Sequence, residues 1–164
     1  MVKRTKIMII LLILSILLGL STVSAGFLGF GDPEVNGVPF KILDGFHTNE
    51  LTGGMDSLGF MTDEYTSDLY PNPVHVYVGI HSTDNLDESK EYYMGQSDEN
   101  HSTLFVNKSS KQISGFNTEL FVVKDSWENN ELEYIYFFTK EGKDFYMSVN
   151  VILKDSELAE ILNA

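Results

Sequence analysis

The sequence LEYIYFFTKEGKDFYMSVNVIL, residues 132–153, decides the fold of this chain. Two apolar, aromatic-rich runs at 132–139 and 144–153 flank the connection KEGK at 140–143, a spacing that predicts a β-hairpin. In the second run large apolar side chains alternate with Tyr146, Ser148 and Asn150, so one face of this strand is predicted to enter the core. The predicted inward residues are Phe145, Met147, Val149, Val151 and Leu153.

A short helix is predicted directly after the hairpin. Asp155 is a suitable N-cap, and Glu157 would lie in the first turn, where an acidic side chain interacts favourably with the helix dipole. Leu158, Ile161 and Leu162 follow at the i, i+3, i+4 spacing of an apolar helical stripe. We expect this stripe to pack on the sheet.

The preceding sequence predicts further short strands. Val74–His81 is the clearest, because its β-branched residues Val74, Val76, Val78 and Ile80 share one face. Strands are also expected at 37–43, 103–106, 111–114 and 119–124, whereas 47–59 is expected to be a loop or a short helix. A helix is expected over 88–94, capped by Asp84 or Asp87 and ended by Gly95.

These elements predict an α+β fold class: an antiparallel sheet of five to seven strands with a C-terminal helix packed on it. The domain organisation predicted is a signal peptide at 1–25, a glycine-containing tether at 26–36 and a single α+β domain at 37–164. We find no internal repeat in the sequence.

The N-terminus has the pattern of an export signal. Basic residues at positions 3, 4 and 6 precede an apolar run, Ile7–Leu20, and small residues follow up to Ala25. The run has 14 residues, short of the roughly 20 needed to cross a bilayer, so we expect cleavage after Ala25. The alternative is an uncleaved anchor, a membrane tether through residues 7–30. In both cases residues 32–164 are expected outside, in the extracellular space or at the cell surface.

Composition excludes several classes of function. With the three basic residues of the signal set aside, eight lysines face 24 acidic residues, a formal charge of −16, and no arginine remains. An acidic domain without arginine is unsuited to binding nucleic acid, which requires Lys and Arg patches. The chain has no cysteine, which excludes a lipoprotein anchor, a disulfide framework and thiol catalysis.

No pattern of residues predicts a metal or cofactor site. His75 and His81 share a strand face, but six residues of extended strand separate them by about 20 Å, and His47 and His101 lie in separate loops. Calcium is the best ligand hypothesis, because Asp84–Glu88 and Asp98–Asn100 offer oxygen ligands. Leu86 nevertheless occupies a ligand position and no glycine follows, so only weak cation association is expected.

Catalytic patterns are similarly incomplete. Ser57 in GMDSLG, residues 54–59, lacks the glycine that a nucleophile elbow needs two residues before the serine. Paired carboxylates for hydrolysis remain an open alternative, because their separation depends on the fold. Trp127 is interpreted as a cap on the sheet edge, with an exposed binding aromatic as the alternative. Asn100 and Asn107 begin two glycosylation sequons, whose use the sequence leaves open.

The order of GVPFKILDGF at 37–46, QISGF at 112–116, the hairpin and DSELAEIL at 155–162 resembles small uncharacterised exported proteins of methanogenic archaea. More distantly it is similar to the Mog1/PsbP-type α+β sandwich. The resemblance implies a binding or accessory role and transfers no catalytic residue. We therefore expect an exported, non-enzymatic binding or accessory domain whose partner is an unknown envelope component or protein. The alternative is a secreted hydrolase or cation-dependent enzyme that uses carboxylates.

Overall fold

The computed structural model describes residues 32–48, 56–95, 103–125 and 131–164. The chain divides into two units, Met1–Asp32 and Pro33–Ala164, and the second contains the elements described below. The expected signal peptide at 1–25 lies outside the described residues, as does the tether up to residue 31. The folded unit nevertheless begins inside the expected 26–36 tether, because Val35 lies in a strand and is completely buried.

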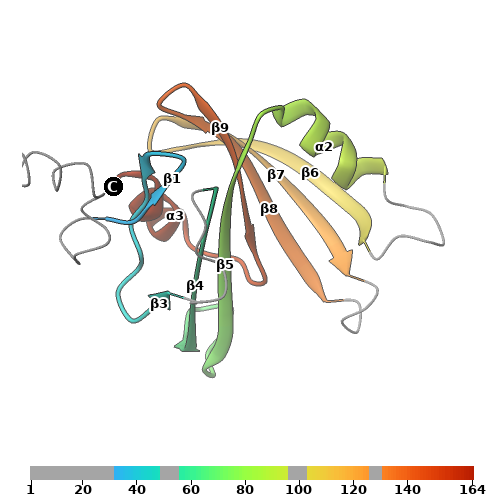
Figure 1. Ribbon diagram of the computed structural model, residues 1–164. Helices are drawn as coiled ribbons and strands as arrows, with labels where there is room; N and C mark the ends of the chain where they lie inside the picture. The colour runs from blue at the N-terminus through green and yellow to red at the C-terminus, as the bar shows by residue number, and fades with distance from the viewer. Residues whose placement is uncertain (1–31, 49–55, 96–102, 126–130) are drawn as a thin grey trace, which may run out of the picture. The chain divides into compact units, whose positions relative to one another are not determined.

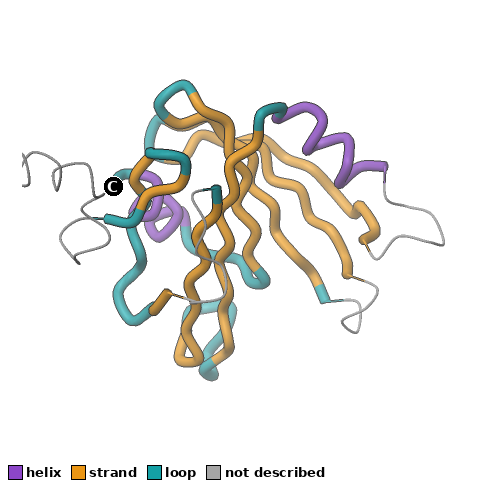
Figure 2. Tube along the Cα trace, in the orientation of Figure 1, coloured by secondary structure: helices purple, strands orange, loops and turns teal. Residues whose placement is uncertain are grey.

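A seven-stranded antiparallel sheet forms most of the unit, with strand order β3-β4-β5-β9-β8-β7-β6 (Figure 1). Its strands are β3 (His47–Thr48), β4 (Ser57–Tyr65), β5 (Val74–Thr83), β6 (Thr103–Ile113), β7 (Phe116–Asp125), β8 (Leu132–Lys140) and β9 (Lys143–Val149). The strands β1 (Glu34–Val35) and β2 (Val38–Pro39) form a separate two-stranded sheet. With the helices α2 (Leu86–Gly95) and α3 (Asp155–Leu162), the fold is broadly α+β and mostly sheet (Figure 2).

The two faces of the large sheet carry separate hydrophobic clusters. In β8, Tyr134, Tyr136 and Phe138 belong to the larger cluster, while the alternate residues Ile135 and Phe137 belong to the smaller one. Alternation follows from the period of two residues in a strand. The larger cluster includes buried residues of α3, and the smaller one contacts Leu86 and Tyr93 of α2. The two helices therefore cover opposite faces of the sheet.

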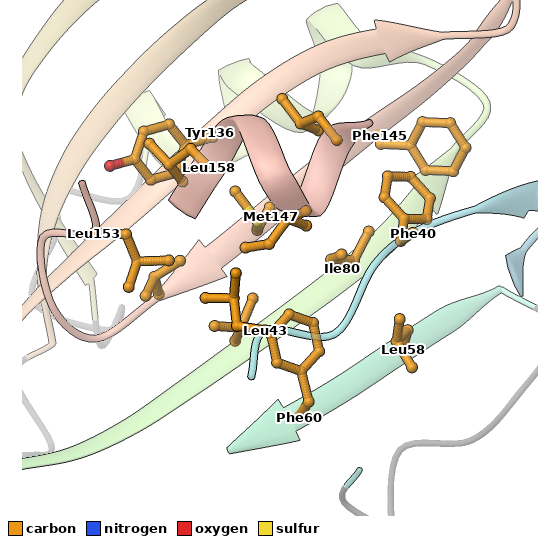
Figure 3. Close-up of a cluster of buried hydrophobic side chains, with 14 of the residues drawn as sticks. Phe40, Leu43, Leu58, Phe60, Ile80, Tyr136, Phe145, Met147, Leu153 and Leu158 are labelled. Carbon is orange, nitrogen blue, oxygen red and sulfur yellow. The ribbon is translucent and has the colours of Figure 1, made fainter. Parts of the chain in front are cut away.

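The hairpin and the C-terminal helix lie in the larger cluster, as expected. All five predicted inward residues of the second run are buried, and so are Leu158, Ile161 and Leu162. Figure 3 shows Leu158 of α3 beside sheet residues such as Met147, with Phe40 and Leu43 of the N-terminal segment also in the cluster. The N-terminal segment is joined to the helix by a hydrogen bond from the Lys41 amide to the Ile161 carbonyl, 3.1 Å long.

Several local predictions are wrong. The interpretation of 47–59 as a loop or short helix misses β3 and the start of β4, while 49–55 lie outside the described residues. The predicted strand 37–43 is strand only at Val38–Pro39, because the chain turns over the core instead of joining the large sheet. The strands expected at 103–106 and 111–114 are one long edge strand, β6, with a register irregularity between Phe105 and Asn107.

The turn of the hairpin shows why the sequence KEGK connects β8 to β9. Lys140 pairs with Lys143, which leaves a two-residue turn in which Glu141 has φ 53° and Gly142 has φ 74°. Two positive φ values in succession define the tight hairpin turn that matches the twist of the strands, and glycine adopts them without steric cost. Lys140 itself is buried, with its ammonium over the Phe40 ring and donating to the Pro39 carbonyl.

Candidate ligand-binding cleft

A cleft of about 500 Å³ lies between α2, the C-terminal end of β5 and Tyr146 of β9. Three tyrosines line it, Tyr92 and Tyr93 from the helix and Tyr146 from β9, and we call it the tyrosine cleft. The remaining lining residues are polar or acidic: Ser82, Thr83, Asp84, Asn85, Glu88 and Ser89. The cleft thus combines aromatic rings with carboxylates and small polar groups.

The sheet positions Tyr146. In the antiparallel pairing of β5 with β9, His81 lies directly opposite Tyr146, and the two rings stack with centroids 4.9 Å apart and planes inclined by 16°. Both residues are on the face that α2 covers, because Tyr146 packs against the smaller cluster. Gly79 lies on the same face two residues earlier, where an added Cβ would come within 3.2 Å of the His81 ring. A glycine at 79 therefore leaves room for the stacked histidine.

The helix positions the other two tyrosines. Asn85 caps α2, since its side-chain oxygen accepts a hydrogen bond of 3.1 Å from the Glu88 amide. The predicted caps were Asp84 and Asp87, and both are wrong. The observed cap, Asn85, is the residue directly after Asp84. Residues four apart share a helix face, which brings Glu88 into line with Tyr92 and Ser89 into line with Tyr93.

The three rings of the cleft are inclined to one another. Tyr92 and Tyr93 are perpendicular, at 88° with centroids 5.3 Å apart, and Tyr93 meets Tyr146 at 66° and 5.9 Å. Tyr92 is 60% exposed, whereas Tyr93 and Tyr146 are half-buried. The rings therefore form an aromatic corner with one wall open to solvent.

Burial sets the protonation of this corner. It raises the pKa of Tyr93, helped by the charges of Tyr146 and Glu133, and it also raises the pKa of Tyr146. Burial lowers the pKa of His81 from 6.5, because the charged ring would lose its solvation. These shifts favour the uncharged forms of His81, Tyr93 and Tyr146.

A second cleft, of about 400 Å³, gathers acidic side chains beside α3. It is lined by Asp44, Glu64, Glu157 and Glu160, together with Phe46 and Tyr65 among others. Glu157 accepts hydrogen bonds from the Tyr65 hydroxyl (2.9 Å) and the Lys154 amide (2.7 Å), and Glu160 pairs with Lys41 at 2.5 Å. Burial and the bond to Glu157 raise the pKa of Tyr65 to about 12. Both glutamates of α3 thus have structural partners.

Most of the candidate residues named in the sequence analysis lie apart from one another in the structure. His75 is exposed and bonds Asp63 at 2.6 Å, His81 stacks on Tyr146, and His47 is exposed in β3. Ser57 begins a strand that continues to Tyr65, so the strand-to-helix context of a nucleophile elbow is missing there. Asn107 is exposed in β6, while Asp98–Asn100, His101 and Trp127 lie outside the described residues.

Within the described ranges, no three His, Asp or Glu side chains are grouped so that they could hold a metal ion. In the same ranges no helix is long and apolar enough to span a membrane.

Sequence reasoning missed the tyrosine cleft. It placed Tyr92 and Tyr93 in a polar helix and Tyr146 on the outer face of a strand, and nothing in their spacing connects the two elements. One signal was available in the sequence: Tyr92 and Tyr93 are adjacent on a predicted helix whose other residues are mostly polar. Adjacent residues point in different directions on a helix, so one ring can face the sheet while the other faces solvent.

Comparisons with known proteins add little. No family model matches the chain, and no curated protein matches its sequence. Among solved structures, LpqN of Mycobacterium tuberculosis, described as involved in cell envelope biogenesis, is similar at 11% identity and a TM-score of 0.35. The similarity covers 76% of this chain and 78% of that one. A likeness this distant supports neither a fold family nor a function.

Proposed function

We propose that the chain is an exported, non-enzymatic binding or accessory domain of the cell surface or envelope, and that the tyrosine cleft is its binding site. The observation that carries the proposal is the exposed ring of Tyr92 beside Tyr93 and Tyr146 in a cleft of about 500 Å³. Pockets that combine aromatic walls with a few polar groups are common ligand sites. The export pattern at residues 1–25 supports the location.

The partner is proposed to be an envelope component or protein outside the cell. If the signal is not cleaved, residues 7–30 would tether the domain to the membrane. The charge of −16 after the signal supports a partner other than nucleic acid. The resemblance to exported archaeal proteins and to the Mog1/PsbP-type sandwich remains a prediction.

A secreted hydrolase or cation-dependent enzyme is the second candidate, and the acidic cleft beside α3 favours it most. That cleft brings Glu64 near Glu157 and Glu160. However, Glu157 and Glu160 already accept bonds from Tyr65 and Lys41, contacts that join α3 to β4 and to the N-terminal segment. These contacts support a structural role for the two glutamates, and so the binding hypothesis.

Retention on isolated envelopes tests the proposal. The exported chain and its Tyr92→Ala variant are added to envelope fractions from the producing cells, and the bound fraction is measured after washing. We expect the wild type to be retained and Tyr92→Ala to lose most of its binding, because the exposed ring supplies contact area without supporting the core. Leu69→Ala, which removes another exposed apolar side chain far along the sequence from the cleft, is the control and should bind like the wild type.

Equal retention of wild type and Tyr92→Ala would contradict the assignment of the cleft. Glu64 lines the acidic cleft. If the wild type hydrolyses a substrate and Glu64→Gln does not, the enzymatic alternative is established instead.

A further inference from the structure

We infer that the tyrosine cleft binds an organic cation, an ammonium group carried on an apolar body. This inference rests on the proposed binding function and specifies the ligand class of the same site. Three features of the cleft carry it: its unneutralised carboxylates, the hydrogen bonds that already engage several of its neutral polar groups, and the geometry of its rings.

The carboxylates of the cleft make its charge negative. Asp84 and Glu88 line it and are exposed, and no basic side chain is among the lining residues. Neither carboxylate forms an ion pair or hydrogen bond with a residue of the part of the chain that the structure describes. An ionised carboxylate only accepts hydrogen bonds, so its ligand partner must be a donor or a cation.

Several of the neutral polar groups of the cleft already form hydrogen bonds within the chain. The Thr83 hydroxyl bonds the Ser89 hydroxyl (2.8 Å) and the Asn85 carbonyl (3.2 Å), and the Asn85 side-chain oxygen caps the helix. The Ser82 hydroxyl donates to the Asp56 carbonyl at 3.3 Å. A neutral sugar needs several free donors and acceptors, and here it would compete with bonds that hold the start of α2. This favours a cation over a saccharide.

The rings supply the remaining requirement. Cations bind over aromatic faces, and sites for quaternary ammonium groups use several rings turned toward one another. Tyr92, Tyr93 and Tyr146 are inclined at 88° and 66°, so they offer surfaces in different directions. A small inorganic cation fits less well, because Ca²⁺ takes six to eight oxygen ligands and the lining provides two carboxylates.

Binding of choline to the exported chain, measured by titration calorimetry and by NMR shifts of the tyrosine rings, tests the inference. The neutral isostere 3,3-dimethylbutan-1-ol and glucose are titrated in parallel. We expect choline to bind, the neutral isostere to bind about tenfold more weakly, and added salt to weaken choline binding. Vesicles of phosphatidylcholine form a further arm, which distinguishes a lipid headgroup from a free cation as the source of the ammonium group.

Variants assign the binding to the cleft. Glu88→Gln and Tyr92→Ala should each weaken choline binding about tenfold, and Tyr92→Phe, which keeps the ring, should recover most of the affinity lost in Tyr92→Ala. Asp87→Asn is the matched control, since Asp87 is exposed on the same helix and does not line the cleft. Far-ultraviolet circular dichroism shows whether each variant is folded.

Equal binding of the neutral isostere, or tighter binding of glucose, would overturn the ligand class while leaving the cleft as a binding site. The absence of choline binding in solution and on vesicles would also overturn it. Envelope retention that depends on Tyr92 would still stand in either case, so the ligand inference and the proposed function can fail separately.

Discussion

At the scale of single residues, His81 shows how sheet register brings two distant rings together. Its partner across the strands is Tyr146, and the two rings stack at 4.9 Å on the face that α2 covers. Gly79, on the same strand face, leaves the space that a Cβ would fill. The stack therefore depends on a cross-strand pairing that joins residues 65 positions apart in the sequence.

This stack predicts a pH dependence of stability. In the unfolded chain His81 titrates near 6.5, and burial lowers its pKa in the folded state. As pH falls from 6.5 toward the folded value, the unfolded chain binds more protons, so the free energy of unfolding decreases. Urea denaturation at pH 7.5, 6 and 5 measures the free energy of unfolding at each pH. His81→Phe, which keeps a stacked ring without titration, should lose less stability than the wild type over this range, and parallel curves would contradict the assignment.

A second residue-scale prediction concerns the core face of β9. Phe145 and Val149 are 0% and 1% exposed, so Phe145→Asp and Val149→Asp should each unfold the unit, because an unpaired buried charge costs about 3–5 kcal/mol. Thermal denaturation followed by circular dichroism is the measurement. Ile152→Asp makes the same change at a side chain that is 40% exposed and should keep a cooperative transition. Wild-type stability of either core variant would show that the inward face is misassigned.

At the scale of elements, the hairpin was predictable and β4 was not. The first strand of the hairpin is a continuous apolar run, the second alternates large apolar residues with polar ones, and the turn contains glycine, all of which are local signals. In β4, Leu58, Phe60 and Thr62 are the buried alternation, but a glycine, a threonine and two acidic residues weaken it, and the register shifts between Thr62 and Tyr65. Pairing with β5 stabilises this strand, and pairing is a tertiary effect that local propensity does not contain.

The cap of α2 supports a prediction about this element. Asn85→Ala should lower the free energy of unfolding by about 1 kcal/mol, because the Glu88 amide would lose its acceptor. Asn85→Asp should retain most of the stability, since aspartate caps equally well. Asp84→Ala is the matched control, one residue outside the cap, and should change stability little. Urea denaturation compares the three variants, and a larger loss in Asp84→Ala than in Asn85→Ala would contradict the observed cap.

The candidate site was less predictable than the fold. Tyr92 and Tyr93 come from α2 and Tyr146 from β9, so the cleft exists only after the helix lies over the sheet. The sequence did indicate the acidic stretch at 84–88, as a source of oxygen ligands for weak calcium association. The structure places Asp84 and Glu88 at the tyrosine cleft and uses Asn85 as a helix cap. The sequence pattern thus pointed to the acidic residues but not to the rings beside them.

At the scale of the whole molecule, processing of the N-terminus is the first prediction. The apolar run Ile7–Leu20 and the small residues up to Ala25 predict cleavage after Ala25. Intact mass or N-terminal sequencing of the exported protein should show a chain that begins at Gly26. A species that still begins near Met1 would identify a retained anchor, and the domain would then be tethered to the membrane.

The last prediction concerns calcium and follows from the distribution of acidic residues over the molecule. The charge of −16 over residues 26–164 attracts cations in general, while Leu86 occupies a ligand position in the acidic stretch 84–88, a spacing that does not match a calcium loop. We therefore expect millimolar calcium to shift the melting temperature little beyond the effect of matched ionic strength. A specific site at one hundred times its dissociation constant would stabilise the domain by about 2.7 kcal/mol, which corresponds to about 10 °C for a domain of this size. A shift that large with calcium alone would contradict weak association and favour the cation-dependent enzyme over the binding domain.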